Sequence, residues 1–220
     1  MFIKIFILKI TMTKLSLDTY NHFKAKEDNH SSWAVWADET DKPSSNIGDL
    51  SIFDEETILD VLNPNIVLVA FSHAGPDRDN IRDIYKMKSF QNFHGSKNDA
   101  RLRFALKGTP LWGAYMTDII KTIAHSKVAV VKKKLKENPG EEELNIDLFL
   151  EELKELKVEK KPILIALGAA VHDMLEKHSN GKLSKFRIEK IMHFSAQGKW
   201  QVRETYRDRV HQEIKDVNLS

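Results

Sequence analysis

The sequence contains no cysteine among its 220 residues. This absence excludes disulfide bonds, cysteine nucleophiles, iron–sulfur clusters and thiolate zinc sites, and it is typical of a reducing compartment. The sequence also has no hydrophobic run long enough to cross a bilayer. The apolar stretch 1–10 is too short and is interrupted by Lys4 and Lys9. We therefore expect a soluble, cytoplasmic protein with no membrane partner.

The first eleven residues lack the small-residue cleavage site of a signal peptide and any pattern that would tie them to a core. A second methionine, Met12, follows them. We interpret residues 1–11 as a non-native or disordered N-terminal extension, with a short edge strand as the alternative. Because a typical domain has about 150 residues, residues 12–220 are expected to form one domain. We also predict that the protein is a monomer.

The net charge of only +2 conceals an uneven distribution along the chain. Residues 27–60 carry ten acidic side chains and one basic one, whereas residues 121–136 carry six lysines and no acid. Residues 182–217 carry nine basic side chains against five acidic ones. The acidic N-terminal part and the basic later half indicate either a polyanionic partner for the basic segments or ordinary solvated faces.

Four short apolar runs have the length and β-branched content of buried strands: residues 66–71, 114–117, 163–167 and 188–192. Patterns with helical spacing lie around and between them, over residues 51–62, 99–106, 146–156, 169–178 and 202–214. Strands that alternate with helices favour a parallel sheet covered on both faces. The pattern predicts a three-layer α/β/α fold around a central, mainly parallel four-stranded sheet.

Polar side chains follow three of the four predicted strands. Ser72 and His73 follow the first, Asp118 the second, and His193 and Ser195 the fourth. Ligands of such sheets bind beyond the carboxyl ends of the strands. We therefore expect these side chains to meet at one edge of the sheet.

Common cofactor and metal motifs are missing. The sequence has no phosphate-binding loop, dinucleotide fingerprint, His-Glu-x-x-His pair or nucleophile elbow. The spacing of His73, His94 and His193 permits a metal site but does not demand one. We predict neither a metal nor a cofactor.

Five stretches, taken in order, resemble the motifs of the uracil-DNA glycosylase superfamily: residues 63–72, 92–94, 113–121, 162–168 and 192–195. In that superfamily one strand ends in a Gly-x-Asn/Asp/Glu-Pro loop and a second in Thr-Asn-Val-Val-Lys or a variant. A third strand ends in Leu-Gly before a helix, and a fourth in His-Pro-Ser. The resemblance covers about residues 63–217, and Asn92-Phe93-His94 is nearest to the Asn-x-Phe-Trp stretch of the mismatch-specific branch.

The chain also departs from these motifs. Ser72 stands where the superfamily has a water-positioning Asn or Asp, and Asp118 stands where it has a base-reading Asn. Phe194 replaces the proline of the last motif, whereas His193 and Ser195 match it. The missing cysteines exclude the branches that carry an iron–sulfur cluster.

The resemblance implies a DNA glycosylase-like enzyme that hydrolyses the N-glycosidic bond of a flipped damaged base, either uracil or another deaminated base. It implies that His193 stabilises the departing anionic base. Asp118 either supports the cationic sugar or reads the base, and an ionised Asp accepts hydrogen bonds but cannot donate them. Ser72 can hold a water molecule, although a hydroxyl is a poor base. The base itself would contact four residues: Asn92, Phe93, Phe71 and His73. For the stacking ring, the alternatives are the neighbouring Phe90 or a core role for Phe93.

The resemblance also places a DNA-binding loop after His193. Ser195, Lys199, Arg203 and Arg207 are therefore candidate contacts to single-stranded or damaged duplex DNA, and the alternative is an amphipathic helix with a solvated face. A second functional class stays open: a catalytically reduced relative that only binds nucleic acid or a nucleotide, which Ser72 favours. The two classes differ in whether Ser72, Asp118 and His193 share a pocket that holds a base.

Overall fold

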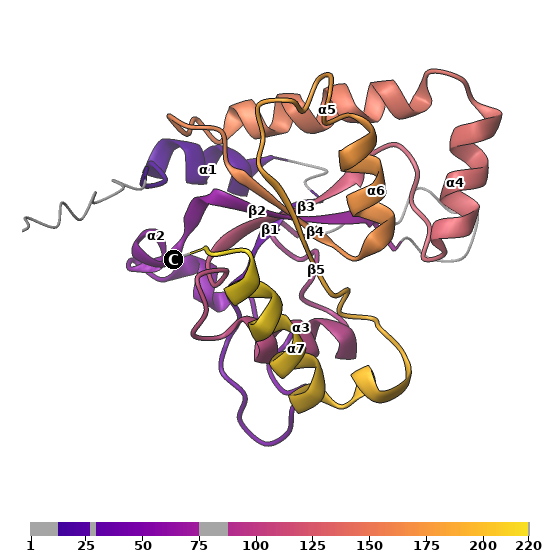
Figure 1. Cartoon of the computed structure of the whole chain (residues 1–220). Helices are drawn as coiled ribbons and strands as arrows, with labels where there is room; N and C mark the ends of the chain where they lie inside the picture. Colours follow the sequence, from indigo (N-terminus) through magenta and orange to yellow (C-terminus); the bar gives the residue numbers. More distant parts are fainter. Residues whose placement is uncertain (1–12, 27–29, 75–87, 220) are drawn as a thin grey trace, which may run out of the picture.

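The computed structural model describes residues 13–26, 30–74 and 88–219 (Figure 1). The predicted extension 1–11 lies outside the described residues, so its interpretation stays a prediction. Within these ranges the chain forms an α/β structure with a central sheet.

The sheet has five strands in the order β1-β3-β2-β4-β5. Their bounds are Ser32–Trp33 (β1), Asn63–Ser72 (β2), Ala114–Ile120 (β3), Ile163–Leu167 (β4) and Ile188–Ile191 (β5). Strands β2 to β5 pair in parallel, and β1 pairs with β3 in antiparallel orientation. The prediction of a four-stranded, mainly parallel sheet is therefore wrong, because the sheet is five-stranded and mixed. A two-residue strand such as β1 is too short to produce an alternating sequence pattern.

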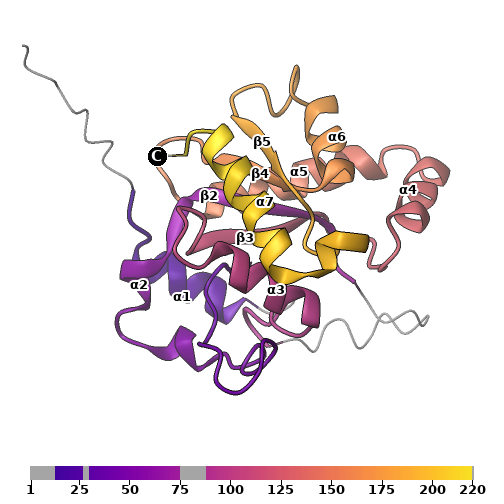
Figure 2. The ribbon, with the colours of Figure 1, turned by 60° about the horizontal axis from the view of Figure 1, so that its bottom comes forward.

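Helices cover both faces of the sheet (Figures 1 and 2). One layer contains α1 (Leu17–Ala25), α4 (Val128–Glu137), α5 (Glu141–Glu155) and α6 (Ala169–Lys177), and the other contains α3 (Lys97–Leu106) and α7 (Arg203–Asp216). Along β2, Val67 and Val69 pack into the first layer, whereas Leu68 and Ala70 pack into the second. Both faces of the strand are buried, which explains its continuous apolar sequence.

Four predicted helices are confirmed as α3, α5, α6 and α7, but the predicted helix over 51–62 is wrong. This segment forms a 3₁₀ turn, η1 (Ser51–Asp54), and a four-residue helix, α2 (Ile58–Val61). Glu55 between them has an extended backbone with φ −71° and ψ 136°, and neither short helix has a side-chain N-cap. The prediction omitted α1 and α4.

The strand order determines where a ligand site can form. Strand β2 lies between β3 and β4, so the connections after β2 and β3 lead to opposite sides of β2. In open α/β sheets such a reversal leaves a crevice at the carboxyl ends of the strands. In this protein the crevice lies beyond the carboxyl ends of β2 and β4.

Candidate functional site

A cleft of about 510 Å³ lies at this crevice. It is lined by eight of the predicted site residues: Ser72, Asp118, His193, Phe93, Asn92, Phe71, His73 and Ser195. Pockets of this size hold small organic ligands. The structure therefore brings together residues that are more than 120 positions apart in sequence, as the strand ends predicted.

His193 is held as a neutral hydrogen-bond donor. Burial lowers its pKa to about 4, so the imidazole is neutral at pH 7. Its Nδ1 accepts a hydrogen bond from the backbone N–H of Ser195 at 3.0 Å, and the Ser195 hydroxyl lies 2.7 Å from the same nitrogen. Since Nδ1 is an acceptor, the single ring proton is on Nε2. Ser195 therefore fixes the tautomer of His193.

Gly168, at the end of β4, allows His193 to approach. Its backbone has φ 90° and ψ 172°, a combination that is essentially restricted to glycine. A Cβ atom at this position would lie 2.9 Å from Cβ of His193. Gly168 therefore has a structural role in the site, because a side chain at this position would displace the imidazole of His193.

Gly168→Ala is expected to destabilise the protein by about 3 kcal/mol through backbone strain and this close approach. Gly140→Ala is the matched control, since Gly140 also has a φ of 90° but a Cβ there would meet no atom within 4 Å. The control should lose only about 1–2 kcal/mol. Urea unfolding measures both, and equal losses would contradict a close packing role for Gly168.

Asp118 is buried within β3, which extends to Ile120 and not only to Thr117. It is 2% exposed and accepts a hydrogen bond from Nδ2 of Asn92 at 3.1 Å. Burial raises the pKa of Asp118 to about 7, although Lys121 and the Asn92 hydrogen bond oppose this effect. Below this pH Asp118 is a neutral acid that can donate as well as accept hydrogen bonds.

The Nδ2 group of Asn92 also donates to the backbone oxygen of His30 at 2.6 Å. Both amide protons of Asn92 therefore have partners, and only its oxygen remains to receive a ligand donor. Asn92 fixes the orientation of the Asp118 carboxyl group in this way.

A partly buried ion pair supports β3 near Asp118. Lys121 lies 2.7 Å from Glu152 of α5, which also accepts a hydrogen bond from the Tyr115 hydroxyl at 3.0 Å. Lys121 lowers the pKa of Glu152, and its charge also acts on Asp118. The sequence analysis did not identify Glu152, because it lies within an ordinary amphipathic helix and belongs to no motif.

Aromatic rings form part of the cleft wall. Phe194 stacks on His193 with ring centroids 4.4 Å apart, and Phe93 meets Phe194 edge-to-face at 6.3 Å. Phe93 has a positive φ of 66°, and its backbone oxygen accepts a hydrogen bond from Nε1 of Trp36 at 3.0 Å. This loop holds Phe93 at the cleft, although the residue is only 8% exposed and also packs in the core beside α3 and α7.

Ser72 and His73 close the side of the cleft next to β2. The Ser72 hydroxyl donates to the backbone oxygen of His125 at 3.2 Å, so its lone pairs are free to accept from water. Burial, together with the nearby His30, lowers the pKa of His73 to about 4. Both side chains are therefore neutral polar groups at pH 7.

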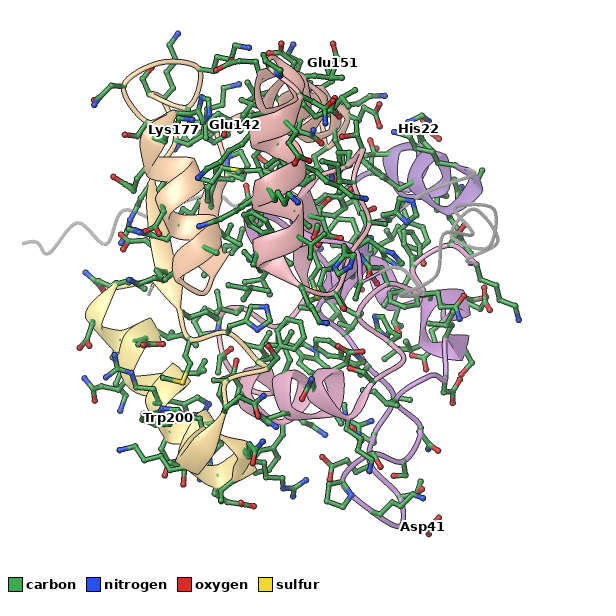
Figure 3. The ribbon with its side chains drawn as sticks, turned by 90° about the vertical axis from the view of Figure 1, so that its right-hand side faces the viewer. His22, Asp41, Glu142, Glu151, Lys177 and Trp200 are labelled. Carbon is green, nitrogen blue, oxygen red and sulfur yellow. The ribbon has the colours of Figure 1, made fainter. Side chains whose placement is uncertain are left out.

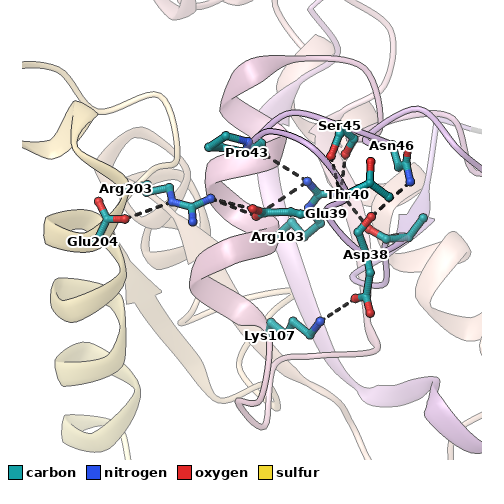
Figure 4. Close-up of polar contacts among 11 residues, drawn as sticks. Asp38, Glu39, Thr40, Pro43, Ser45, Asn46, Arg103, Lys107, Arg203 and Glu204 are labelled. Carbon is teal, nitrogen blue, oxygen red and sulfur yellow. Dashed lines mark hydrogen bonds and ion pairs between the residues drawn. The ribbon is translucent and has the colours of Figure 1, made fainter.

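The three predicted phosphate-binding residues Lys199, Arg203 and Arg207 do not line the cleft. Figure 4 shows Arg203 paired with Glu39, at 2.8 Å and 3.0 Å from its two carboxylate oxygens. Arg207 pairs with Asp208 at 2.8 Å, and Lys199 lies over the Trp200 ring. Their role in DNA binding stays a prediction, and Arg203 has a structural partner that the sequence did not reveal.

Arg103 of α3 organises the acidic loop that carries Glu39 (Figure 4). Its guanidinium donates to the backbone oxygens of Ala37, Pro43 and Ser45 at 2.8–3.0 Å. The side chain is 3% exposed. Part of the acidic N-terminal region is thus bound by the protein's own arginines.

The described residues contain no group of three or more His, Asp or Glu side chains placed to hold a metal ion. His73 and His193 line the cleft, whereas His94 is buried against the Trp36 and Phe53 rings. Within the described ranges, no helix combines the length and the apolar character that crossing a membrane requires.

Comparisons with protein-family models, curated proteins and solved structures gave no match to this chain.

Proposed function

We propose that the protein is a DNA glycosylase-like enzyme that hydrolyses the N-glycosidic bond of a flipped, deaminated base. The observation that carries this proposal is the meeting of three groups in one cleft: the Nε2–H of His193, the carboxyl group of Asp118 and the ring of Phe93. These groups match the three needs of a departing base, which are an anion-stabilising donor, a partner for its polar edge and a surface on which to stack.

In this mechanism the bond between the base and C1′ breaks, and its electron pair leaves with the base. His193 donates a hydrogen bond from Nε2 to the oxygen on which the negative charge develops. Water then adds its oxygen to C1′, and its proton neutralises the departed base. The products are an abasic site and a free base, so atoms and charge balance without a cofactor.

Asp118 is suited to read the base when it is protonated. A neutral carboxyl group offers one donor and one acceptor side by side, as an amide does. Uracil and hypoxanthine each present a ring N–H beside a carbonyl oxygen, which complements this pair. The hydrogen bond from Asn92 holds the carboxyl group in place.

A second function, binding without hydrolysis, is favoured by Ser72. At the position where the superfamily has an Asn or Asp, Ser72 presents only a hydroxyl that already donates to the backbone of His125. Water is then weakly activated, and the cleft would hold a base without releasing it.

Excision assays distinguish these two functions. Labelled oligonucleotides containing uracil, hypoxanthine, xanthine or a mismatch are incubated with the protein and treated with alkali, which breaks the strand at abasic sites. Breaks at the modified position are expected for the enzyme. Binding of the same oligonucleotides without any breaks would support the binding function instead.

Phe93→Leu is expected to weaken base insertion, because stacking of a base on an aromatic ring contributes about 1–3 kcal/mol. The probe is 2-aminopurine at the flipped position, which becomes more fluorescent when it leaves the base stack. A loss of about 1 kcal/mol or more means that Phe93→Leu needs about five-fold or more higher protein concentration than the wild type to reach the same fluorescence. Phe90→Leu is the matched control, since Phe90 has a similar φ of 63° but is buried in the core, away from the cleft. Equal effects of both variants would assign Phe93 to the core.

A further inference from the structure

Helix α4 presents an exposed surface of unpaired lysines. We define the α4 lysine surface as four exposed residues, Lys127, Lys132, Lys134 and Lys136. Because an α-helix has about 3.6 residues per turn, Lys132 and Lys136 lie on the flank of α4 beside α6, and Lys127 and Lys134 lie on its other flank. In the part of the chain that the structure describes, their side chains form no ion pair, whereas Lys133 of the same helix pairs with Glu137 at 3.7 Å. Lysines four residues apart on a helix, such as Lys132 and Lys136, repel each other. A bound polyanion would remove this repulsion.

Helix α7 differs sharply from α4 in its charge balance. Its four basic residues, Arg203, Arg207, Arg209 and Lys215, are matched by four acids in the same helix. All three arginines of α7 also form ion pairs, with Glu39, Asp208 and Glu213. Of these two helices, α4 therefore has more positive charge available to attract an anion.

The α4 lysine surface begins at the rim of the cleft. His125, Ser126 and Val128, which lead into the helix, are part of the cleft lining. From Lys127 to Lys136 the helix rises about 13 Å, so these lysines extend along a path that leads away from the cleft. Figure 3 looks onto the side of the molecule that carries α4, and Trp200, near the start of α7, lies at the lower left of this view.

A groove of about 390 Å³ between α4 and α6 continues this surface. Lys132, Lys136 and Lys177 line it together with two acids, Glu142 and Asp173. Glu142 is already paired with Lys177 at 2.6 Å and with His178 at 2.9 Å. Among the described residues, the charges of the groove that have no ion-pair partner are therefore those of Lys132, Lys136 and the exposed Asp173.

We propose that the phosphate backbone of a single DNA strand runs along the α4 lysine surface and feeds a base into the cleft. This proposal rests on the proposed function for the identity of the polyanion. It moves the principal phosphate contacts from the loop after His193 and from α7 to the helix after β3. The occupant is nucleic acid, because a chain of phosphates can contact lysines on both flanks of α4 along more than two helical turns.

The test is the salt dependence of binding to an unmodified single-stranded oligonucleotide, which contains no base to excise. The variant Lys132→Gln/Lys134→Gln/Lys136→Gln keeps the helix-forming character of α4 and removes three charges. Losing three phosphate contacts should flatten the slope of log K against log salt by about 2. The control Lys154→Gln/Lys160→Gln/Lys185→Gln removes the same charge from exposed positions at the opposite, amino-terminal end of β4 and β5.

The proposal predicts a flatter slope for the α4 variant and an unchanged slope for the control. An α4 variant with the wild-type slope, equal changes in both triple variants, or no binding by the wild type would overturn it. A flatter slope for Arg203→Gln/Arg207→Gln alone would return the contacts to α7. If the α4 result is obtained but no base is excised from any oligonucleotide, the surface assignment stands and the glycosylase proposal fails.

Discussion

His193→Ala is expected to slow base excision by about 100- to 1000-fold, equivalent to roughly 2.7–4 kcal/mol of transition-state stabilisation. The reason is the loss of a preorganised donor: burial keeps the ring neutral, and Ser195 fixes the proton on Nε2. The loss should appear in the single-turnover rate constant, because the charge on the base develops only as the bond breaks.

Ser195→Ala provides the graded control for this prediction. It removes the hydroxyl contact to Nδ1 but keeps the backbone N–H, so the tautomer of His193 is retained and the rate should fall much less. Circular dichroism and the urea midpoint show whether each variant is folded. A folded His193→Ala protein with the wild-type single-turnover rate would remove His193 from the mechanism.

Asp118→Asn is expected to make the protein more stable than the wild type at pH 8 by up to about 4 kcal/mol. Burial raises the pKa of Asp118 from 3.8 to about 7, and each pKa unit corresponds to about 1.36 kcal/mol. The folded wild type therefore holds a proton that the unfolded chain has lost, and its stability falls as the pH rises from about 4 to about 7. The amide group introduced by the substitution needs no such proton.

The measurement is the free energy of unfolding of both proteins at several pH values between 4 and 8. Their difference should grow towards pH 7 and then remain constant. Asp173→Asn, which neutralises an exposed carboxylate, should leave the pH dependence of the wild type unchanged. Parallel curves for the wild type and Asp118→Asn would show that Asp118 ionises normally in the folded protein.

The same variant tests how Asp118 reads the base. If the protonated acid is the active form, wild-type excision decreases above pH 7, whereas Asp118→Asn keeps its rate there because an amide always offers a donor. An increase of wild-type activity through pH 7 would instead assign the ionised carboxylate to stabilisation of the cationic sugar. The two roles that the sequence left open thus predict opposite pH profiles.

Strands β2 and β4 could be predicted because each contains a continuous apolar run, whereas β3 contains Asp118 and β5 contains Glu189 and Lys190. Residues 66–71 and 163–167 show this pattern most clearly, and His193 followed from its position after the last strand. Such local patterns indicate where a site can form. Asn92 and Phe93 became candidates only through the resemblance of the motif order, and their roles stay predictions.

The remaining features depend on contacts between distant residues. Glu39 and Arg203 are 164 positions apart, and Lys121 and Glu152 are 31 positions apart, so neither ion pair leaves a local pattern. The raised pKa of Asp118 depends on burial under several elements, which sequence spacing does not show. Strand β1 has two residues and was therefore missed.

The most direct measurement is the release of free base, quantified by mass spectrometry, from single-stranded oligonucleotides that contain uracil, hypoxanthine or xanthine. Wild-type protein in excess at pH 6.5, where Asp118 is mainly protonated, should release at least one of these bases and leave an equal amount of abasic sites. His193→Ala should release it at least about 100-fold more slowly. No release of any of the three bases from oligonucleotides that the protein demonstrably binds would contradict the account and leave a binding protein.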